Sequence, residues 1–143
     1  MIAIGSDHGG VNLKAYIEQF LEKNGFEYKD FGTYDTNSCD YPDIAEKVCK
    51  SIVAGECERG ILVCGTGIGM SIAANKIDGI RAAHATDTYS SKMAREHNNA
   101  NVLCLGERIT GCDLALEIVN SYLNAQFQGG RHEERVKKIM NLE

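Results

Sequence analysis

The sequence lacks the features that mark several common classes of protein. Its six cysteines include no Cys-x-x-Cys pair and no cysteine–histidine cluster with the spacing of a zinc site. No apolar run approaches the length of a membrane span, and Ser6 and Asp7 come too early for the core of a signal peptide. We therefore expect no metal site and no membrane span, and we expect a cytoplasmic protein with reduced thiols.

The sequence also lacks an excess of positive charge, an internal repeat and a low-complexity linker. Its formal net charge is −5, and both signs are mixed along the chain. This balance gives no indication of binding to nucleic acid or to a membrane surface, so an anionic ligand would have to be met by local cations. The length of 143 residues suits one ordinary domain, which we expect to span residues 1–143.

Short β-rich runs alternate with longer amphipathic segments along the whole chain. The expected strands are residues 2–5, 27–31, 60–64, 80–85 and 101–105. The expected helices are residues 11–23, 42–53, a helix that opens near 67–69, 87–96, 113–125 and a basic helical tail over 131–142. The alternation predicts an α/β fold.

Five strands alternating with helices predict a doubly wound, Rossmann-like parallel sheet, for which we expect the common order 2-1-3-4-5. Ligands of such sheets bind outside the carboxyl ends of the strands, where the first and third strands lie side by side. The loops that leave this point are the glycine-rich residues 6–10 (SDHGG) and 64–69 (CGTGIG). We expect these two loops to meet at one site.

The loop of residues 64–69 is suited to holding negative charge. Glycines let backbone N–H groups approach a ligand, and the following helix adds positive potential. The spacing does not match the standard phosphate loops, because G-x-G-x-x-G would need glycine at Met70 and the Walker pattern would need a G-K-[ST] ending. The loop is expected to stabilise charge formed during a reaction. A structural glycine turn explains the loop alone equally well.

Cys64 ends the third expected strand, where a thiolate could serve as base or nucleophile. The alternative is a small buried core residue, which is the usual role of a lone cysteine. A phosphatase of the C-x5-R type would need arginine at Met70, so we favour a proton carrier. The remaining cysteines are interpreted as ordinary packing residues; they are Cys39, Cys49, Cys57, Cys104 and Cys112.

Six segments together resemble the ribose-5-phosphate isomerase B family from end to end. They are GSDHGG, GTYD followed by DYPD, CGTGIGMSIAANK, REHNNANVL, GERITG and QGGRHEERV. The galactose-6-phosphate isomerase subunits and the allose-6-phosphate isomerases belong to the same superfamily, but the QGGRHEERV tail together with Cys64 fits the pentose enzyme best. Some members replace the cysteine and place a glutamate base where this chain has Met70, so Cys64 is the base that this sequence supports.

The resemblance implies interconversion of ribose 5-phosphate and ribulose 5-phosphate through a cis-enediolate, without metal or cofactor. Cys64 would move a proton between C2 and C1, and His97 would open the sugar ring with help from Thr66. The residues expected to contact the substrate are Asp7, His8, Tyr41, Gly65, Gly67, Ile68, Gly69, Asn98, Arg108, Arg131 and Arg135. The loop N–H groups among them would hold the enediolate oxygens.

Arg131 and Arg135 lie four residues apart, on one face of a helical tail that can close over the site and bind phosphate. Without the resemblance, a solvated basic face would be the better interpretation of this tail. His132 and His84 are left out of the expected site, because an ordinary surface or core histidine explains each of them.

His97 ends the expected helix before the fifth strand, so it should lie at the amino end of the sheet, opposite Cys64. A catalytic His97 would then have to come from a second chain, in a homodimer with two composite sites or in a dimer of dimers. The family resemblance implies the same sharing. Two alternatives stay open: an isomerase of a hexose 6-phosphate, and a nucleotide-binding regulatory module that would need no thiol.

Overall fold

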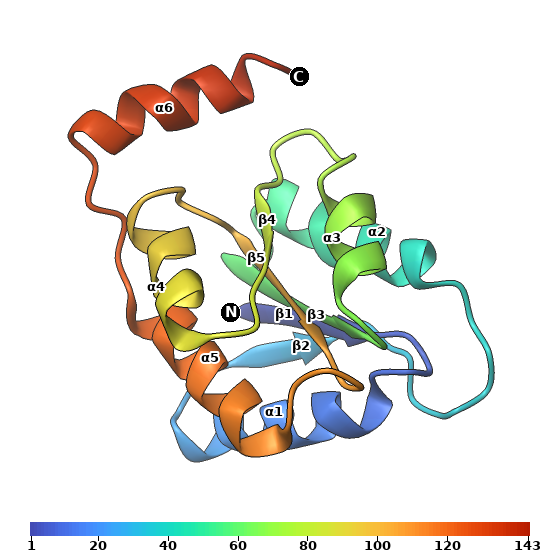
Figure 1. Cartoon of the computed structure of the whole chain (residues 1–143). Coiled ribbons are helices and arrows are strands. Elements are labelled where there is room, and N and C mark those ends of the chain that lie inside the picture. Colours follow the sequence, from blue (N-terminus) through green and yellow to red (C-terminus); the bar gives the residue numbers. More distant parts are fainter.

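The structure is a computed structural model that describes residues 1–143. Its strands are β1 (Ile2–Ser6), β2 (Tyr28–Asp30), β3 (Arg59–Cys64), β4 (Ala82–His84) and β5 (Val102–Gly106). Its helices are α1 (Val11–Lys23), α2 (Tyr41–Val53), α3 (Ile68–Ala74), α4 (Thr88–Glu96), α5 (Cys112–Asn124) and α6 (Arg131–Met140). Helices α1, α4 and α5 cover one face of the sheet, α2 and α3 cover the other, and α6 lies apart (Figure 1).

The five strands form one parallel sheet in the order β2-β1-β3-β5-β4. The doubly wound α/β class is confirmed, but the predicted order 2-1-3-4-5 is wrong in its last two strands. The reason is burial: all five residues of β5 are buried, whereas the three residues of β4 are partly or fully exposed. A strand buried on both faces belongs inside a parallel sheet, and a short, partly polar strand suits its edge.

Alternate residues of the central strands pack into two separate hydrophobic clusters, one on each face. Ile61 and Val63 point toward α1 and α5, while Leu62 and Cys64 point toward α2 and α3. Each fully buried aliphatic side chain contributes about 1.5–3 kcal/mol of transfer free energy. The pleat of β3 therefore fixes the face on which the Cys64 side chain lies.

The helix boundaries have local causes. Pro42 lies in the first turn of α2, as predicted, where its missing N–H group costs no hydrogen bond. Asp87 precedes α4 and accepts a hydrogen bond from the Ser90 N–H group at 2.7 Å, and this bond lowers the pKa of Asp87. None of the helices combines the length and the hydrophobicity needed to cross a membrane.

Candidate active site

Three loops meet at the carboxyl end of the sheet, after β1, β3 and β5. The register aligns Ser6 with Val63 and Cys64 with Gly106, so the three strands end at nearly the same level. Backbone hydrogen bonds then join the loops: the N–H groups of Glu107 and Arg108 donate to the carbonyls of Cys64 and Gly65 at 2.9 and 3.0 Å. The loops therefore form one connected rim.

The two glycine-rich loops touch each other within this rim, as predicted. A Cβ atom added to Gly9 would lie 3.3 Å from the Gly65 nitrogen, and one added to Gly65 would lie 3.1 Å from Nη1 of Arg108. Asp7 is buried, and its Oδ1 atom accepts a hydrogen bond from the Gly9 N–H group at 2.8 Å. The structure thus brings Asp7, the glycine loop and Arg108 together in one chain.

Cys64 is 4% exposed at the base of the rim. Its Sγ atom accepts a hydrogen bond from the backbone N–H group of Gly67 at 3.1 Å. Gly67 has a φ of 81°, a left-handed conformation that places this N–H group over the sulfur and that side chains rarely tolerate. The contact puts a hydrogen-bond donor where it would stabilise negative charge on sulfur. The fully buried Met70 lies in the same cluster, so the only nearby base on this segment is the thiol.

The loop N–H groups fall into two classes. Those of Gly67 and Ile68 already donate within the chain, to Cys64 Sγ and to Thr66 Oγ1 at 3.1 and 3.2 Å. Those of Gly65, Thr66 and Gly69 donate no hydrogen bond within the chain. These three N–H groups are therefore free to meet a substrate oxygen.

Further side chains surround the loop. The Tyr41 ring packs on Gly69, because a Cβ atom there would come within 2.7 Å of it. His8 accepts a hydrogen bond on Nδ1 from the Cys39 N–H group at 3.2 Å, which leaves its Nε2 atom free. Thr66 is exposed beside the loop. We call this set the carboxyl-end group; its members are Asp7, His8, Tyr41, Cys64, Gly65, Thr66, Gly67, Ile68, Gly69 and Arg108.

The other expected site residues lie at the opposite end of the sheet. His97 and Asn98 follow α4 and precede β5, so they lie at the amino end of that strand (Figure 1). Gly106, at the carboxyl end of β5, is level with Cys64. The two ends of β5 are roughly 13 Å apart at a rise of ~3.3 Å per residue.

Helix α6 also lies at the amino end. Its His132 ring stacks on the His97 ring, with centroids 4.1 Å apart and planes 11° apart. At its far end, Arg81 Nη1 donates to the Met140 sulfur at 3.3 Å. Arg131 and Arg135 are exposed on this helix, which lies far from the loops that follow β1 and β3 (Figure 1). We call His97, Asn98, Arg131 and Arg135 the amino-end group.

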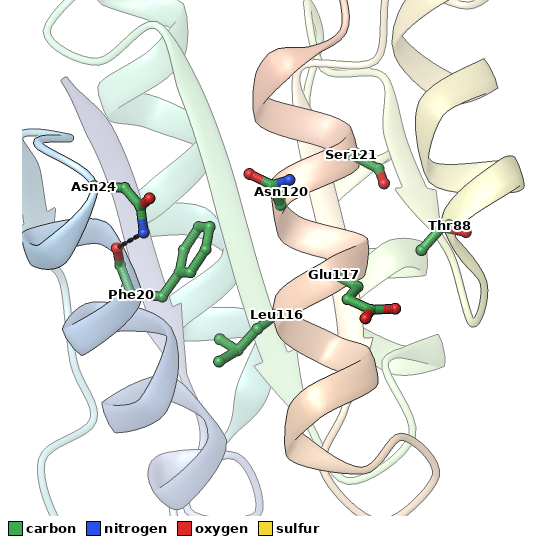
Figure 2. A pocket seen from close by; sticks show the side chains of 7 residues that line it. All are labelled: Phe20, Asn24, Thr88, Leu116, Glu117, Asn120 and Ser121. Atoms are coloured by element: carbon green, nitrogen blue, oxygen red, sulfur yellow. Dashed lines mark hydrogen bonds between the residues drawn. The ribbon is translucent and has the colours of Figure 1, made fainter.

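A groove of about 510 Å³ lies elsewhere, between α1, α4 and α5. Figure 2 shows Phe20 and Leu116 facing it from α1 and α5, with the Asn24 amide donating to the Phe20 carbonyl at 2.8 Å. Its only charged lining residue is Glu117, and a phosphate needs cations, so this groove does not suit a sugar phosphate. No group of three or more His, Cys, Asp or Glu side chains is placed to hold a metal ion.

Sequence reasoning missed two residues that support these groups. Glu107 Oε1 accepts a hydrogen bond from the Leu13 N–H group at 2.6 Å and so caps α1 from the loop after β5. His132 was left out of the expected site although it stacks on His97. Both contacts join residues that are distant in sequence. The only sequence signal was that His132 lies between Arg131 and Arg135, which were expected to bind phosphate.

Comparisons with known proteins show the family to which this chain belongs. Residues 2–139 match the sequence profile of the Ribose/Galactose Isomerase family. The solved structure of Clostridium thermocellum ribose-5-phosphate isomerase B is similar at a TM-score of 0.97 and 59% identity, over 99% of this chain and 95% of that one. Ribose-5-phosphate isomerase B of Escherichia coli is 46% identical over 99% of this chain and 95% of that protein. D-erythrulose-4-phosphate isomerase of Pectobacterium atrosepticum is also 46% identical, over 96% of this chain and 91% of that protein.

Proposed function

Because this chain belongs to the ribose/galactose isomerase family, we propose that it interconverts D-ribose 5-phosphate and D-ribulose 5-phosphate. The observation that carries the proposal is Cys64, whose buried sulfur accepts a hydrogen bond from the Gly67 N–H group, in a loop where the N–H groups of Gly65 and Gly69 are free. Full-length similarity to two proteins named ribose-5-phosphate isomerase B supports the pentose substrate. The hexose 6-phosphate alternative finds no such support among these relatives.

In the proposed reaction Cys64 acts as the base on the open-chain sugar. The thiolate takes the proton from C2 of the aldose and returns it to C1, while the hydroxyl proton on O2 passes to O1, which gives the ketose. A cis-enediolate forms in between, and its oxygens need hydrogen-bond donors. The N–H groups of Gly65 and Gly69 supply donors that are already in place, and those of Gly67 and Ile68 lie beside them.

The remaining roles are assigned by the same proposal. His97, with Thr66, opens the furanose ring by taking the proton of the C1 hydroxyl and supplying one to the ring oxygen. Asp7 and Asn98 bind sugar hydroxyls. The phosphate contacts are assigned to the cations Arg131 and Arg135. The other substrate contacts are assigned to His8, Tyr41 and Arg108.

These roles require two chains. The carboxyl-end group and the amino-end group lie at opposite ends of one sheet, so Cys64 and His97 of one chain cannot act on the same sugar. We propose a twofold homodimer in which each of two sites takes one group from each chain; a dimer of dimers would keep the same arrangement. A cytoplasmic location stays a prediction that rests on six free cysteines.

The test is proton exchange followed by NMR. In deuterated water the protein should convert ribose 5-phosphate to ribulose 5-phosphate and exchange the carbon-bound proton at C2. A nucleotide-binding module would bind without exchanging this proton, so absence of both exchange and conversion would overturn the proposal. Parallel kinetics on erythrose 4-phosphate and allose 6-phosphate would rank tetrose and hexose against pentose, since one relative is named for a tetrose phosphate.

A further inference from the structure

The histidine pair at the end of α4 has a geometry that ordinary packing does not require. The two rings are nearly parallel, with planes 11° apart and centroids 4.1 Å apart. His132 is 8% exposed, in the first turn of a helix that is rich in charged residues. Burying an imidazole flat against a second imidazole restricts rotation of both rings about their χ2 torsions.

The same junction is tied by hydrogen bonds. The Gln128 N–H group donates to the Glu96 carbonyl at 3.0 Å, and the Gln128 side-chain amide donates to Glu96 Oε2 at 3.0 Å. The segment before α6 is therefore attached to the last residue of α4, next to His97. Since Arg131 and Arg135 flank His132 on α6, the proposed phosphate ligands and the proposed ring-opening group share one junction.

We infer that His132 is a positioning residue: its ring fixes the plane of the His97 imidazole and couples that plane to the helix that carries Arg131 and Arg135. The inference rests on the proposed function, because it assigns the stack a purpose in ring opening. An imidazole that exchanges protons with two oxygens of a sugar must hold its nitrogens in line with them, and a misplacement of ~1 Å can cost roughly a hundredfold in rate.

The electrostatics of the pair are compatible with this role. Burial, followed by the nearby His97, Arg131 and Arg135, lowers the pKa of His132. At neutral pH His132 is therefore uncharged, and it does not repel a proton that His97 carries during ring opening. A permanently charged side chain at position 132 would oppose that step.

A double-mutant cycle on kcat/KM for ribose 5-phosphate separates positioning from simple packing. His97→Ala should lose about a hundredfold to ten-thousandfold and retain turnover of the small open-chain fraction of the sugar. His132→Ala should lose about tenfold or more in the wild-type background. In the His97→Ala background it should lose less than about twofold, because no ring remains to be positioned.

Val136→Ala provides the matched control. Val136 is buried one turn further along α6 and is assigned no part in ring opening or in phosphate binding. Its effect should be the same factor in both backgrounds. An equal loss for His132→Ala in both backgrounds, or no loss in the wild-type background, would overturn the inference while leaving the isomerase proposal intact. An inactive wild-type protein would instead refute the proposed function, and the inference with it.

A second pair of variants keeps the test decisive if His132→Ala does not fold. His132→Phe retains a flat ring, and His132→Leu fills the space without one. We expect His132→Phe to stay within about threefold of wild type and His132→Leu to lose about tenfold. Equal activities of these two variants would show that a flat ring is not what His97 needs.

Discussion

The two ends of the sheet are built by different means. At the carboxyl end, backbone groups do the assembly: carbonyls of Cys64 and Gly65 accept hydrogen bonds from the next loop, and the Gly67 N–H group holds the Cys64 sulfur. At the amino end, side chains contribute more: the rings of His97 and His132 stack, and Gln128 donates to Glu96 from both its backbone and its side chain. The carboxyl end is therefore joined mainly by backbone hydrogen bonds, whereas the amino end carries cations on α6, which lies apart from the sheet (Figure 1).

This difference matches the division of the proposed chemistry. Moving a proton between two adjacent carbons needs a buried base and donors that do not reorganise during the reaction. Capturing a phosphate needs accessible positive charge, and the exposed Arg131 and Arg135 provide it. One chain carries both proposed groups but holds them apart along β5, which is why the proposal builds each site from two chains.

The largest effect should come from the carboxyl end. Cys64→Ala should lower kcat by at least about a thousandfold, because it removes the base, and substrate binding should largely survive. Cys49→Ala is the matched control: Cys49 is buried in the same cluster, and burial raises its pKa to about 12, so it stays a neutral thiol. Steady-state kinetics and calorimetric binding would measure both. Near-normal turnover of a folded Cys64→Ala protein would exclude the thiol as the base.

The next effect tests whether the two ends act across chains. Cys64→Ala and His97→Ala proteins, each expected to retain at most about one hundredth of wild-type activity, are mixed and their subunits are allowed to exchange. About half of the dimers should be mixed, and each mixed dimer has one intact site of two, so about a quarter of normal activity should return. Native mass spectrometry would verify the exchange. No return of activity despite verified mixed dimers would contradict shared sites.

A smaller effect is expected from the amino end alone. Arg131→Ala and Arg135→Ala should each lower kcat/KM by a several-fold to hundredfold factor, since a charge-assisted hydrogen bond contributes about 1.5–3 kcal/mol. The phosphate is remote from C1 and C2, so substrate capture should suffer most. Lys138→Ala, an exposed change further along the same helix, should leave kcat/KM unchanged. If neither arginine variant differs from Lys138→Ala, the helix is not part of the site.

The sequence predicted local structure well and long-range neighbours less well. The helix over residues 11–23 was predicted with its observed bounds because its apolar residues recur with a helical period. The predicted order of β4 and β5 was wrong, because strand order depends on which strand is buried by the rest of the molecule. A signal was present: residues 102–105 are all apolar, whereas the run from Arg81 to His84 is polar at both ends.

The candidate site divides in the same way. The carboxyl-end loops were predictable, since glycines directly after the first and third strands must meet at the edge where parallel strands end. The separation of His97 from Cys64 also followed from topology. The contacts of Glu107 with α1 and of His132 with His97 did not, because they are tertiary contacts between segments that share no sequence pattern.

The smallest expected effect concerns folding stability alone and comes from a residue outside the proposed site. Glu18 on α1 lies near Asp30, which forms a 2.7 Å ion pair with the buried Lys14. Burial first, and then Asp30, raises the pKa of Glu18 from 4.5 to about 7. A folded-state pKa above the unfolded value means that the native protein binds the proton more tightly. The contribution of Glu18 to stability is therefore complete below about pH 4.5 and is lost as the pH rises to about 7.

Glu18→Gln removes that loss because an amide cannot ionise. We expect the variant to be more stable than wild type by about 1 kcal/mol at pH 8, a value discounted for partial exposure, and nearly equal to it at pH 4.5. Urea denaturation at the two pH values would measure the difference. Glu117→Gln, which removes an exposed carboxylate on α5, is the matched control for the loss of one negative charge. Turnover at saturating substrate should be unchanged, since Glu18 belongs to neither group. An equal shift in stability at both pH values would mean that Glu18 has the same pKa in the folded and the unfolded protein, and that its neighbourhood is more open to water than its buried Oε1 atom indicates.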